Sequence, residues 1–363
     1  MHITARISSL LLAVSLATTA QAQWFGAVYT QSNDPAGNAV QVALRLPSGN
    51  LVPFASFHTG GDGTGAGLGS QGALADANGN RLLVVNAGSN ELTLFRTFAD
   101  VFLWRTDTVA SGGSMPTSVA AHGNLVYVLN SGSDTVDGFR IVGNQLHAIA
   151  GASYPLSQSG AAGAQVAFSP NGRFLLATER ATDKIAVWPV HNNGRLGAAQ
   201  FQNSAGTTPF GFAFRGDDVL FVSEAAGGSA GASTASSYRL QNDGTLVTLT
   251  SAAPTTQSAA CWAAIPRGGH FGYTANTGSG TITGYALGGN GSLTLLDPSG
   301  VSGSLAAGGR AIDLDFDPRG RFLFVLDSGN DTINAFRRNH DGSLTAIGSA
   351  LPVVDGTAGL LVR

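Results

Sequence analysis

Charged residues are scarce in this chain. Asp, Glu, Lys and Arg make up 11% of the 363 residues, whereas 43% are hydrophobic. This composition excludes a disordered chain and a helical protein with charged outer faces. The net charge of −3 supplies no electrostatic attraction to nucleic acid or to an acidic membrane. We therefore expect neither as a partner.

Cysteine and metal-ligating clusters are also lacking. Cys261 is the only cysteine, so no intramolecular disulfide can form and stability has to come from packing. We expect Cys261 to be a small buried hydrophobe at the start of an inner strand. The histidines form no H-x-x-H or H-E-x-x-H cluster. We therefore predict no metal site and no cofactor.

No segment has the roughly 20 apolar residues that a membrane-spanning helix requires. An apolar stretch at Ile7–Ala17 follows a weakly basic start and precedes the small-x-small sequence Ala20-Gln21-Ala22. This order is typical of a secretory signal. We predict a signal peptide at 1–22 and a single mature domain at 23–363. The mature protein is expected to be a monomer in the periplasm or outside the cell.

What the chain does contain is one repeated pattern. Each copy has a Gly turn, a β-rich run, a polar residue, a second turn and a strand that ends in an aromatic residue. A tight turn such as NDG, GNG or HDG then leads to a further strand, and such turns suit a hairpin. No sustained helical periodicity appears in the mature chain. The clearest copies are NGNRLLVVNAGSNELTLF (78–95), HGNLVYVLNSGSDTVDGF (122–139), NGRFLLATERATDKIAVW (171–188) and RGRFLFVLDSGNDTINAF (319–336).

The polar residue of each copy recurs at intervals of 44 to 56 residues, which match a four-stranded propeller blade. The repeats predict an all-β, seven-bladed β-propeller. The first copy lacks its first strand, and the C-terminal sequence DGTAGLLVR resembles the missing strand. We expect that strand to complete blade 1 and close the ring. The seven polar positions are Thr30, Asn86, Asn130, Glu179, Glu224, Asn276 and Asp327.

The tryptophans have an expected structural role. Bulky aromatic rings fill large volumes in a protein interior, and the gaps between neighbouring blades are such volumes. We expect the side chains there to be those of Trp24, Trp104, Trp188 and Trp262.

Two motifs resemble catalytic signatures without the flanking elements that those signatures need. HTGGDGTGAGLGSQG (58–72) contains a G-x-G-x-x-G, but strand, turn and strand follow it instead of a helix. We interpret it as a long loop over the mouth of the propeller, where glycine relieves steric conflict. GGSAG (227–231) matches a nucleophile elbow but lies in a loop. We therefore interpret Ser229 as a loop residue.

Polar side chains are expected to gather at one mouth of the channel, because the loops that enter the inner strands and those that leave the second strands share a face. In one interpretation these side chains only cap turns. In the other, Glu179 and Glu224 depart from the Asn/Asp pattern because they serve a ligand by general acid–base chemistry. Glu224 is the candidate catalytic residue. The candidate binding residues are Glu179, Gln165, Asn86, Asn130, Asn276, Asp313 and Asp327.

The signature SPNGRFLLATE…DKIAVWPV…NGRL resembles the seven-bladed lactonase family, which includes bacterial 6-phosphogluconolactonase and the fungal carboxymuconate-lactonizing enzyme. The resemblance covers essentially the whole mature chain. It implies metal-free catalysis by a His, two Arg and a Glu at the channel mouth, and the Glu matches Glu224. The His position falls near Ala164 and Gln165. One Arg position falls on Phe210 and the other within TTQSAAC (255–261), so none of these three is kept.

These departures leave two functional hypotheses. Without the His and Arg, a phosphorylated or polyanionic lactone is disfavoured. The first hypothesis is an exported lactonase-like hydrolase of a small neutral lactone or ester. Glu224 would activate water, and Gln165, Asn276 or loop amides would hold the oxyanion. The second is a non-catalytic propeller that binds a small molecule or a protein partner through loops 58–71, 225–237 and 297–310.

Overall fold

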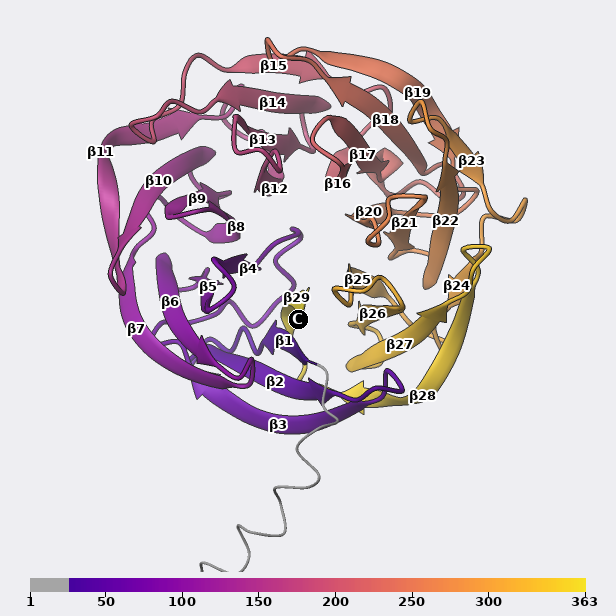
Figure 1. The fold of residues 1–363 in the computed structure, drawn as a ribbon, viewed down its shortest axis with the longest axis horizontal. Helices are drawn as coiled ribbons and strands as arrows, with labels where there is room; N and C mark the ends of the chain where they lie inside the picture. Colours follow the sequence, from indigo (N-terminus) through magenta and orange to yellow (C-terminus); the bar gives the residue numbers. More distant parts are fainter. Residues whose placement is uncertain (1–25) are drawn as a thin grey trace, which may run out of the picture.

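The computed structural model describes residues 26–363, which form seven antiparallel sheets around a central channel (Figure 1). Each sheet is one blade of a propeller, and the predicted fold is confirmed. The predicted signal peptide at 1–22 lies outside the described residues.

The first four blades have four strands each. From the channel outward, blade 1 consists of β29 (Ala358–Val362), β1 (Ala27–Gln31), β2 (Ala39–Arg45) and β3 (Leu51–His58). Blade 2 consists of β4 (Leu74–Ala77), β5 (Arg81–Asn86), β6 (Glu91–Phe98) and β7 (Phe102–Ala110). Blade 3 consists of β8 (Pro116–His122), β9 (Leu125–Asn130), β10 (Thr135–Val142) and β11 (Gln145–Pro155). Blade 4 consists of β12 (Gly163–Phe168), β13 (Phe174–Glu179), β14 (Lys184–Pro189) and β15 (Gln200–Asn203).

The remaining blades follow the same plan, with one short addition in blade 6. Blade 5 consists of β16 (Pro209–Arg215), β17 (Val219–Glu224), β18 (Thr234–Leu240) and β19 (Leu246–Pro254), with a 3₁₀ turn at η1 (Ala226–Gly228). Blade 6 consists of β20 (Ala260–Ala264), β21 (Phe271–Asn276), β22 (Thr281–Leu287) and β23 (Leu293–Leu295), and β24 (Gly303–Ser304) also pairs with β22. Blade 7 consists of β25 (Ala311–Phe316), β26 (Phe322–Asp327), β27 (Thr332–Arg338) and β28 (Leu344–Pro352).

Burial falls from the second strand of a blade to its outer strand. β9 and β17 are buried along their whole length, because neighbouring blades cover both faces of each sheet. Their sequences, LVYVLN and VLFVSE, are accordingly near-continuous hydrophobic runs that end in one or two polar residues. The outer strand β11 is mostly exposed. The hydrophobic core therefore lies between blades, around the inner three strands.

The tryptophans follow this distribution only in part. Trp188 is buried in a cluster with Tyr127 and Leu129 of blade 3, as expected of an inter-blade residue. Trp262 lies at the channel, where its Nε1 donates to the Ser70 carbonyl at 2.9 Å. Trp104 is 70% exposed on β7, so the prediction for it is wrong. Trp24 lies outside the described residues.

The ring is closed by the C-terminal strand, as the sequence predicts. β29 pairs antiparallel with β1, with Val28 opposite Val362 and Tyr29 opposite Leu361. The next residue, Arg363, then reaches blade 2, where its Nε donates to Asp76 Oδ2 at 2.9 Å. The pairing covers the inner edge of β1, and β29 becomes the innermost strand of blade 1.

The glycine-rich loop 59–73 crosses the channel and bonds to several blades. Gln71 donates its backbone N–H to Ala164 O of blade 4 at 3.0 Å, and its side-chain amide exchanges two hydrogen bonds with the Ala263 backbone of blade 6. Ser70 Oγ donates to Thr117 O of blade 3 at 2.7 Å. Figure 1 shows the loop inside the ring. We call it the channel loop.

Arginines link successive blades on one face of the propeller. Arg81 donates to Gly143 O, Arg140 to Asn193 O, and Arg173 to Asn242 Oδ1, at 2.7, 3.0 and 2.7 Å. Arg215 continues the series by donating to Gly288 O at 2.6 Å. Each bond joins one blade to the next, and each acceptor is neutral. We call this face, at which the inner strands end, the arginine face, and the opposite one the loop face.

Two carboxylates of blade 7 hold the closing strand. Leu360 N–H donates to Asp313 Oδ2 at 2.9 Å, and Val362 N–H donates to Asp315 Oδ2 at 2.8 Å. Burial raises the pKa of Asp313 well above its ordinary value and that of Asp315 to about 7. The charge of Asp317 adds to the rise at Asp315, and the charge of Asp315 to the rise at Asp313.

We predict that the protein loses stability as the pH rises from about 4 to 7. The folded protein binds protons at Asp313 and Asp315 that the unfolded chain has released above its ordinary carboxyl pKa of about 3.9. The free energy of unfolding therefore falls with pH, by up to about 1.4 kcal/mol per pH unit for each such proton. Calorimetry should give a higher Tm at pH 5 than at pH 7.5. Asp315→Asn should make the slope of Tm against pH shallower, and a Tm that rises over this interval would contradict the assignment.

Candidate functional site

A pocket of about 450 Å³ opens at the loop face of the channel. The channel loop supplies one wall through residues 65–70, and the segment 355–359 that leads into β29 supplies another. The starts of the inner strands of blades 5, 6 and 7 complete it with Phe210, Trp262 and Ile312. The channel loop and the closing segment, which have no copy in the other blades, thus supply two of the walls of the pocket.

Two ionisable groups of opposite charge line this pocket. Arg310 and Asp355 are both exposed side chains, and neither forms an ion pair among residues 26–363. Thr277 and Ser328 add hydroxyl groups to the lining. The pocket therefore combines one carboxylate, one guanidinium and neutral hydrogen-bonding groups with an aromatic floor.

A second guanidinium lies behind the wall. Arg180 is half-buried, with its guanidinium carbon 5.4 Å above the Phe210 ring and its Nε donating to Ala162 O at 3.1 Å. Burial lowers the pKa of Arg180, and no described carboxylate forms an ion pair with it. Gly69 has φ +59°, and a Cβ there would lie 3.2 Å from Arg180 Nη1. Glycine thus lets the channel loop pass next to this cation.

Cys261 also lines the pocket, near the start of β20 as predicted. Burial raises the pKa of its thiol to about 11. The thiol is therefore protonated at neutral pH, and a protonated thiol is a weak nucleophile. The side chain is a buried hydrophobe in this wall.

Six of the seven polar positions that mark the repeats end the second strands, and their side chains point into the blades, whereas Thr30 is one residue before the end of β1 and lines the cavity at the seam between blades 7 and 1. Asn86 Nδ2 donates to Thr93 Oγ1 at 2.8 Å, and Asn130 Nδ2 donates to Asp137 Oδ2 at 2.8 Å. Asn276 Nδ2 donates to Thr283 Oγ1 at 2.9 Å. In each case the partner lies seven residues later, on the third strand. Asp327 accepts from the backbone N–H groups of Arg310 and Gly329. All four are buried, which supports the turn-capping interpretation.

Glu179 and Glu224 are likewise completely buried. The Glu224 carboxylate accepts from Ser204 Oγ at 3.0 Å, from Gly206 N–H at 2.8 Å and from Thr234 Oγ1. Glu179 accepts from Ser157 and Thr182 in the same way. Both carboxylates fix the loop that arrives from the preceding blade, and neither lines the pocket. A catalytic role for Glu224 remains a prediction.

Gln165 and Asp313 line a different cavity, of about 240 Å³, on the arginine-face side of the channel loop. Gln165 accepts from Phe212 N–H at 2.6 Å and donates to Phe212 O at 3.1 Å, and so joins blades 4 and 5. Asp313 binds β29. The channel loop, through Gln71, separates these residues from the pocket.

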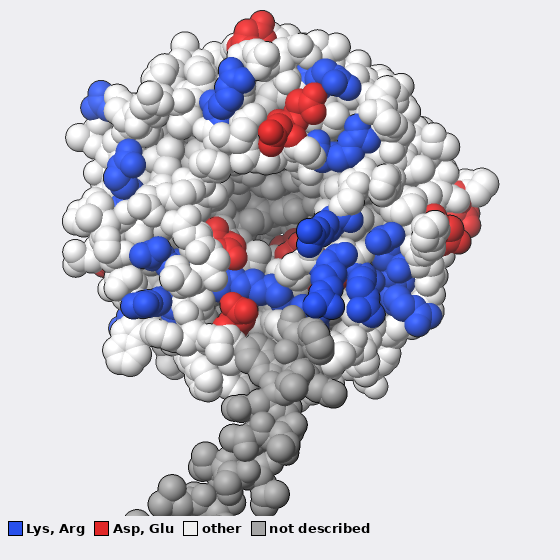
Figure 2. Space-filling view, in the orientation of Figure 1, with Lys and Arg blue, Asp and Glu red and all other residues white. Residues whose placement is uncertain are grey.

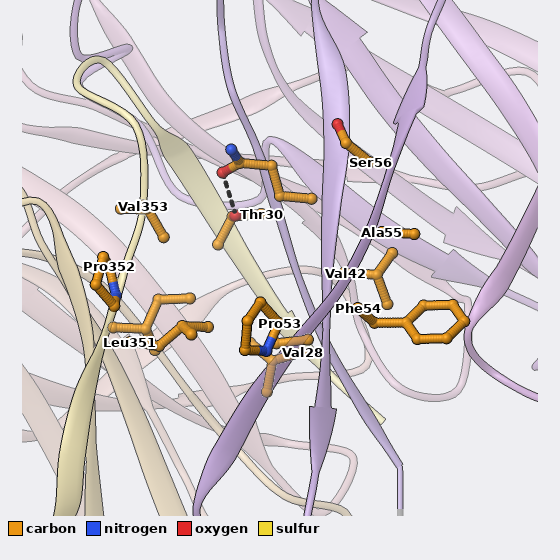
Figure 3. Close-up of a pocket in the computed structure, with 13 residues that line it drawn as sticks. Val28, Thr30, Val42, Pro53, Phe54, Ala55, Ser56, Leu351, Pro352 and Val353 are labelled. Atoms are coloured by element: carbon orange, nitrogen blue, oxygen red, sulfur yellow. Dashed lines mark hydrogen bonds between the residues drawn. The ribbon is translucent and has the colours of Figure 1, made fainter.

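A third cavity lies at the seam between blades 7 and 1 (Figure 3), with a volume of about 270 Å³. Val28, Pro53 and Leu351 are among its apolar lining, and its polar members include Thr30 and Gln41, whose side chains bond at 3.4 Å. It contains no ionisable group, so it offers no acid–base chemistry. Among residues 26–363, no group of three His, Cys, Asp or Glu side chains is placed to hold a metal ion.

The sequence interpretation missed Asp355. It sits in VVDGTAG, a segment without a copy in the other blades, so the repeats give no register for it. Its position at the mouth follows only once the C-terminal strand β29 is known to be the inner strand of blade 1. Residues that precede an inner strand lie on the loop face. Arg310 precedes the inner strand of blade 7, so its placement at the mouth does follow from the repeats.

Fold and pocket together define a class: a closed seven-bladed propeller with a ligand-sized pocket at the mouth of its channel. The family model described as lactonase, 7-bladed β-propeller, matches residues 145–230 and 215–359. The chain belongs to this family.

Solved structures with the same fold include two bacterial proteins whose descriptions name a lactonase. A putative 6-phosphogluconolactonase of Bacteroides fragilis has 18% identity and a TM-score of 0.75, with 93% of this chain and 98% of that chain covered. A periplasmic gluconolactonase of Pseudomonas aeruginosa has 19% identity and a TM-score of 0.73, with 92% and 99% covered. At this identity the likeness shows the fold alone. No curated protein matches the chain in sequence.

Proposed function

We propose that this protein is an exported lactonase-like hydrolase that opens a small neutral lactone or ester in the pocket at the loop face. The single observation that carries the proposal is the pocket itself, where Asp355 and Arg310 line an aromatic-floored cavity of about 450 Å³. Membership of the lactonase family supports the reaction class, and the periplasmic gluconolactonase of similar fold is compatible with export.

The pocket residues have distinct chemical roles in this proposal. Asp355 would take a proton from the attacking water, and the guanidinium of Arg310 would stabilise the negative charge that develops on the carbonyl oxygen. Opening of a neutral lactone yields a hydroxy acid, whose carboxylate a guanidinium binds well. Glu224 is the alternative base, although its buried carboxylate is already occupied by hydrogen bonds.

A non-catalytic propeller is the second candidate. The observation that favours it is that the acidic and amide groups at the ends of the second strands hold loops in place. Only the channel loop and the closing segment would then contact a ligand, which would bind without being converted.

The experiment is a hydrolysis assay with neutral γ- and δ-lactones, glucono-δ-lactone among them. We expect turnover by the wild type, and a fall in kcat/KM of about 10²- to 10³-fold in Asp355→Asn and in Arg310→Gln. Both side chains are exposed, so Tm should change little. Asp62→Asn, an exposed loop-face carboxylate outside the pocket, is the matched control and should keep full activity.

Two outcomes would count against the proposal. No turnover of any lactone by the folded wild type would favour the binding propeller, and calorimetric titration with the same lactones would then test for binding. Full activity in both Asp355→Asn and Arg310→Gln would place the reaction elsewhere.

A further inference from the structure

Positive charge is concentrated on the arginine face. At this face lie Arg267, Arg321 and Arg337, which are exposed and form no ion pair with a described carboxylate. The inter-blade arginines described above lie on the same face and donate to neutral oxygens. Figure 2 shows Lys and Arg side chains spread over one face, around the mouth of the channel. The net charge of −3 is a sum over the whole chain and does not reveal how the charges are distributed between the two faces.

Acidic groups on this face neutralise it only in part. Asp76 and Asp100 pair with Arg363, Asp317 with Arg45, and Asp218 with Arg239. Exposed carboxylates also remain at the turns, namely Asp217, Asp243 and Asp341. On the loop face, by contrast, the turns between second and third strands carry Asp134, Asp183 and Asp331. The two faces therefore differ in the sign of their potential.

The basic face also contains a hollow of headgroup size. A cavity of about 260 Å³ lies between the turns that follow β16 and β20, and Arg215 and Arg267 line it. Gly216, Gly268 and Gly269 are also among its lining residues. Two guanidinium groups beside glycine backbone suit a phosphate group.

Exposed aromatic side chains lie at the rim of this face on blade 2. Phe98 and Phe102 stand opposite each other at the β6–β7 hairpin and are 48% and 54% exposed, and Trp104 is 70% exposed. Phe102 extends the cluster to Phe54 of blade 1, with ring centroids 5.3 Å apart. Such rings, with one apolar body and nearby Arg side chains, are typical of surfaces that enter the headgroup region of a bilayer.

We propose that the arginine face docks on the surface of a bilayer that contains anionic phospholipid. Arginines bind the phosphates, the Arg215–Arg267 cavity holds one headgroup, and Phe98, Phe102 and Trp104 enter the interface at the rim. Among residues 26–363 no helix is long and apolar enough to cross a membrane, and the contact is peripheral. The pocket at the loop face then points away from the lipid.

Vesicle binding tests this proposal with the mature protein. We expect co-sedimentation with vesicles of about 30% phosphatidylglycerol in phosphatidylcholine at low salt, little with phosphatidylcholine alone, and loss at high salt. Arg267→Ser/Arg337→Ser should weaken binding about 30-fold, since each basic residue near an anionic bilayer contributes roughly a factor of five. Arg105→Ser/Lys184→Ser is the matched control and should bind like the wild type, because the Arg105 side chain lies beside Gly60 and Lys184 begins β14, both on the loop-face side.

Tryptophan fluorescence distinguishes a bilayer from any other polyanion. Trp104 emission should shift to the blue on vesicles and stay unchanged on soluble heparin, with Trp104→Phe as the reference for the other tryptophans. No binding to the anionic vesicles would overturn the proposal, as would equal weakening by the two double substitutions. Binding to heparin as tight as to vesicles, without a Trp104 shift, would assign the face to a soluble polyanion instead.

Discussion

Deletion of residues 357–363 is expected to abolish the folded monomer. Without β29, blade 1 loses its inner strand, and β1 is left as an open edge on the channel. Asp313 and Asp315 lose the N–H groups of Leu360 and Val362. The salt bridge between Arg363 and Asp76, which ties blade 1 to blade 2, is lost as well. Size-exclusion chromatography and circular dichroism should show aggregate or unfolded chain.

A milder change tests the same idea without removing the strand. Leu360 is 6% exposed and packs in a cluster with Val28 and Phe324. Leu360→Ala should lower the free energy of unfolding, measured by urea denaturation, by about 2–4 kcal/mol. Val354→Ala, at a residue 48% exposed in the segment before β29, should cost less than about 0.5 kcal/mol. Equal effects of the two would mean that the terminal strand is not part of the cooperative core.

Glu224→Ala is expected to have the second large effect, and primarily on stability. The carboxylate is fully buried and accepts from Ser204, Gly206 and Thr234, so its removal leaves at least three donors without their acceptor. Each unsatisfied buried group costs about 1–3 kcal/mol. Gly206 adds a packing reason, since a Cβ there would lie 2.1 Å from Glu224 Oε2, so the loop is built around this carboxylate. We expect a loss of about 3–5 kcal/mol in the free energy of unfolding.

Glu224→Gln separates stability from catalysis. It keeps the shape and one acceptor oxygen but turns an NH₂ group toward a donor, and we expect a loss of about 1–3 kcal/mol. Glu91→Gln, at a half-buried glutamate, is the control and should be near neutral. If Glu224 only holds the loop, folded Glu224→Gln should keep most of the lactonase activity below its Tm. Abolished activity in a folded Glu224→Gln protein would restore Glu224 as the general base.

The fold follows from the sequence because each blade repeats the same local chemistry. A hydrophobic run that ends in one or two polar residues needs a neighbour on both sides, and seven such runs at similar spacing can satisfy one another only in a ring. The closing strand is predictable for the same reason, since DGTAGLLVR has the pattern that the first repeat lacks. What the pattern does not specify is the direction in which each polar end points.

The candidate site illustrates that gap. Asn86, Glu179 and Glu224 lie where the repeats place them, yet they are buried. Asn86 donates to a side chain on the third strand, and the two glutamates accept from the loop that arrives from the preceding blade. The pocket instead depends on segments without repeats, the channel loop and the stretch around Asp355. Non-repeating segments carry no internal register, so their positions come from tertiary contacts such as Gln71 to Ala263.

Gln71 also affects which parts of the channel a ligand can reach. Because the channel loop is bonded to blades 3, 4 and 6, the two cavities on its sides are separate chambers instead of one continuous tunnel. A ligand that enters the pocket lined by Asp355 therefore leaves through the same opening, at the loop face. Anything drawn to the opposite, arginine-rich side never meets Arg310.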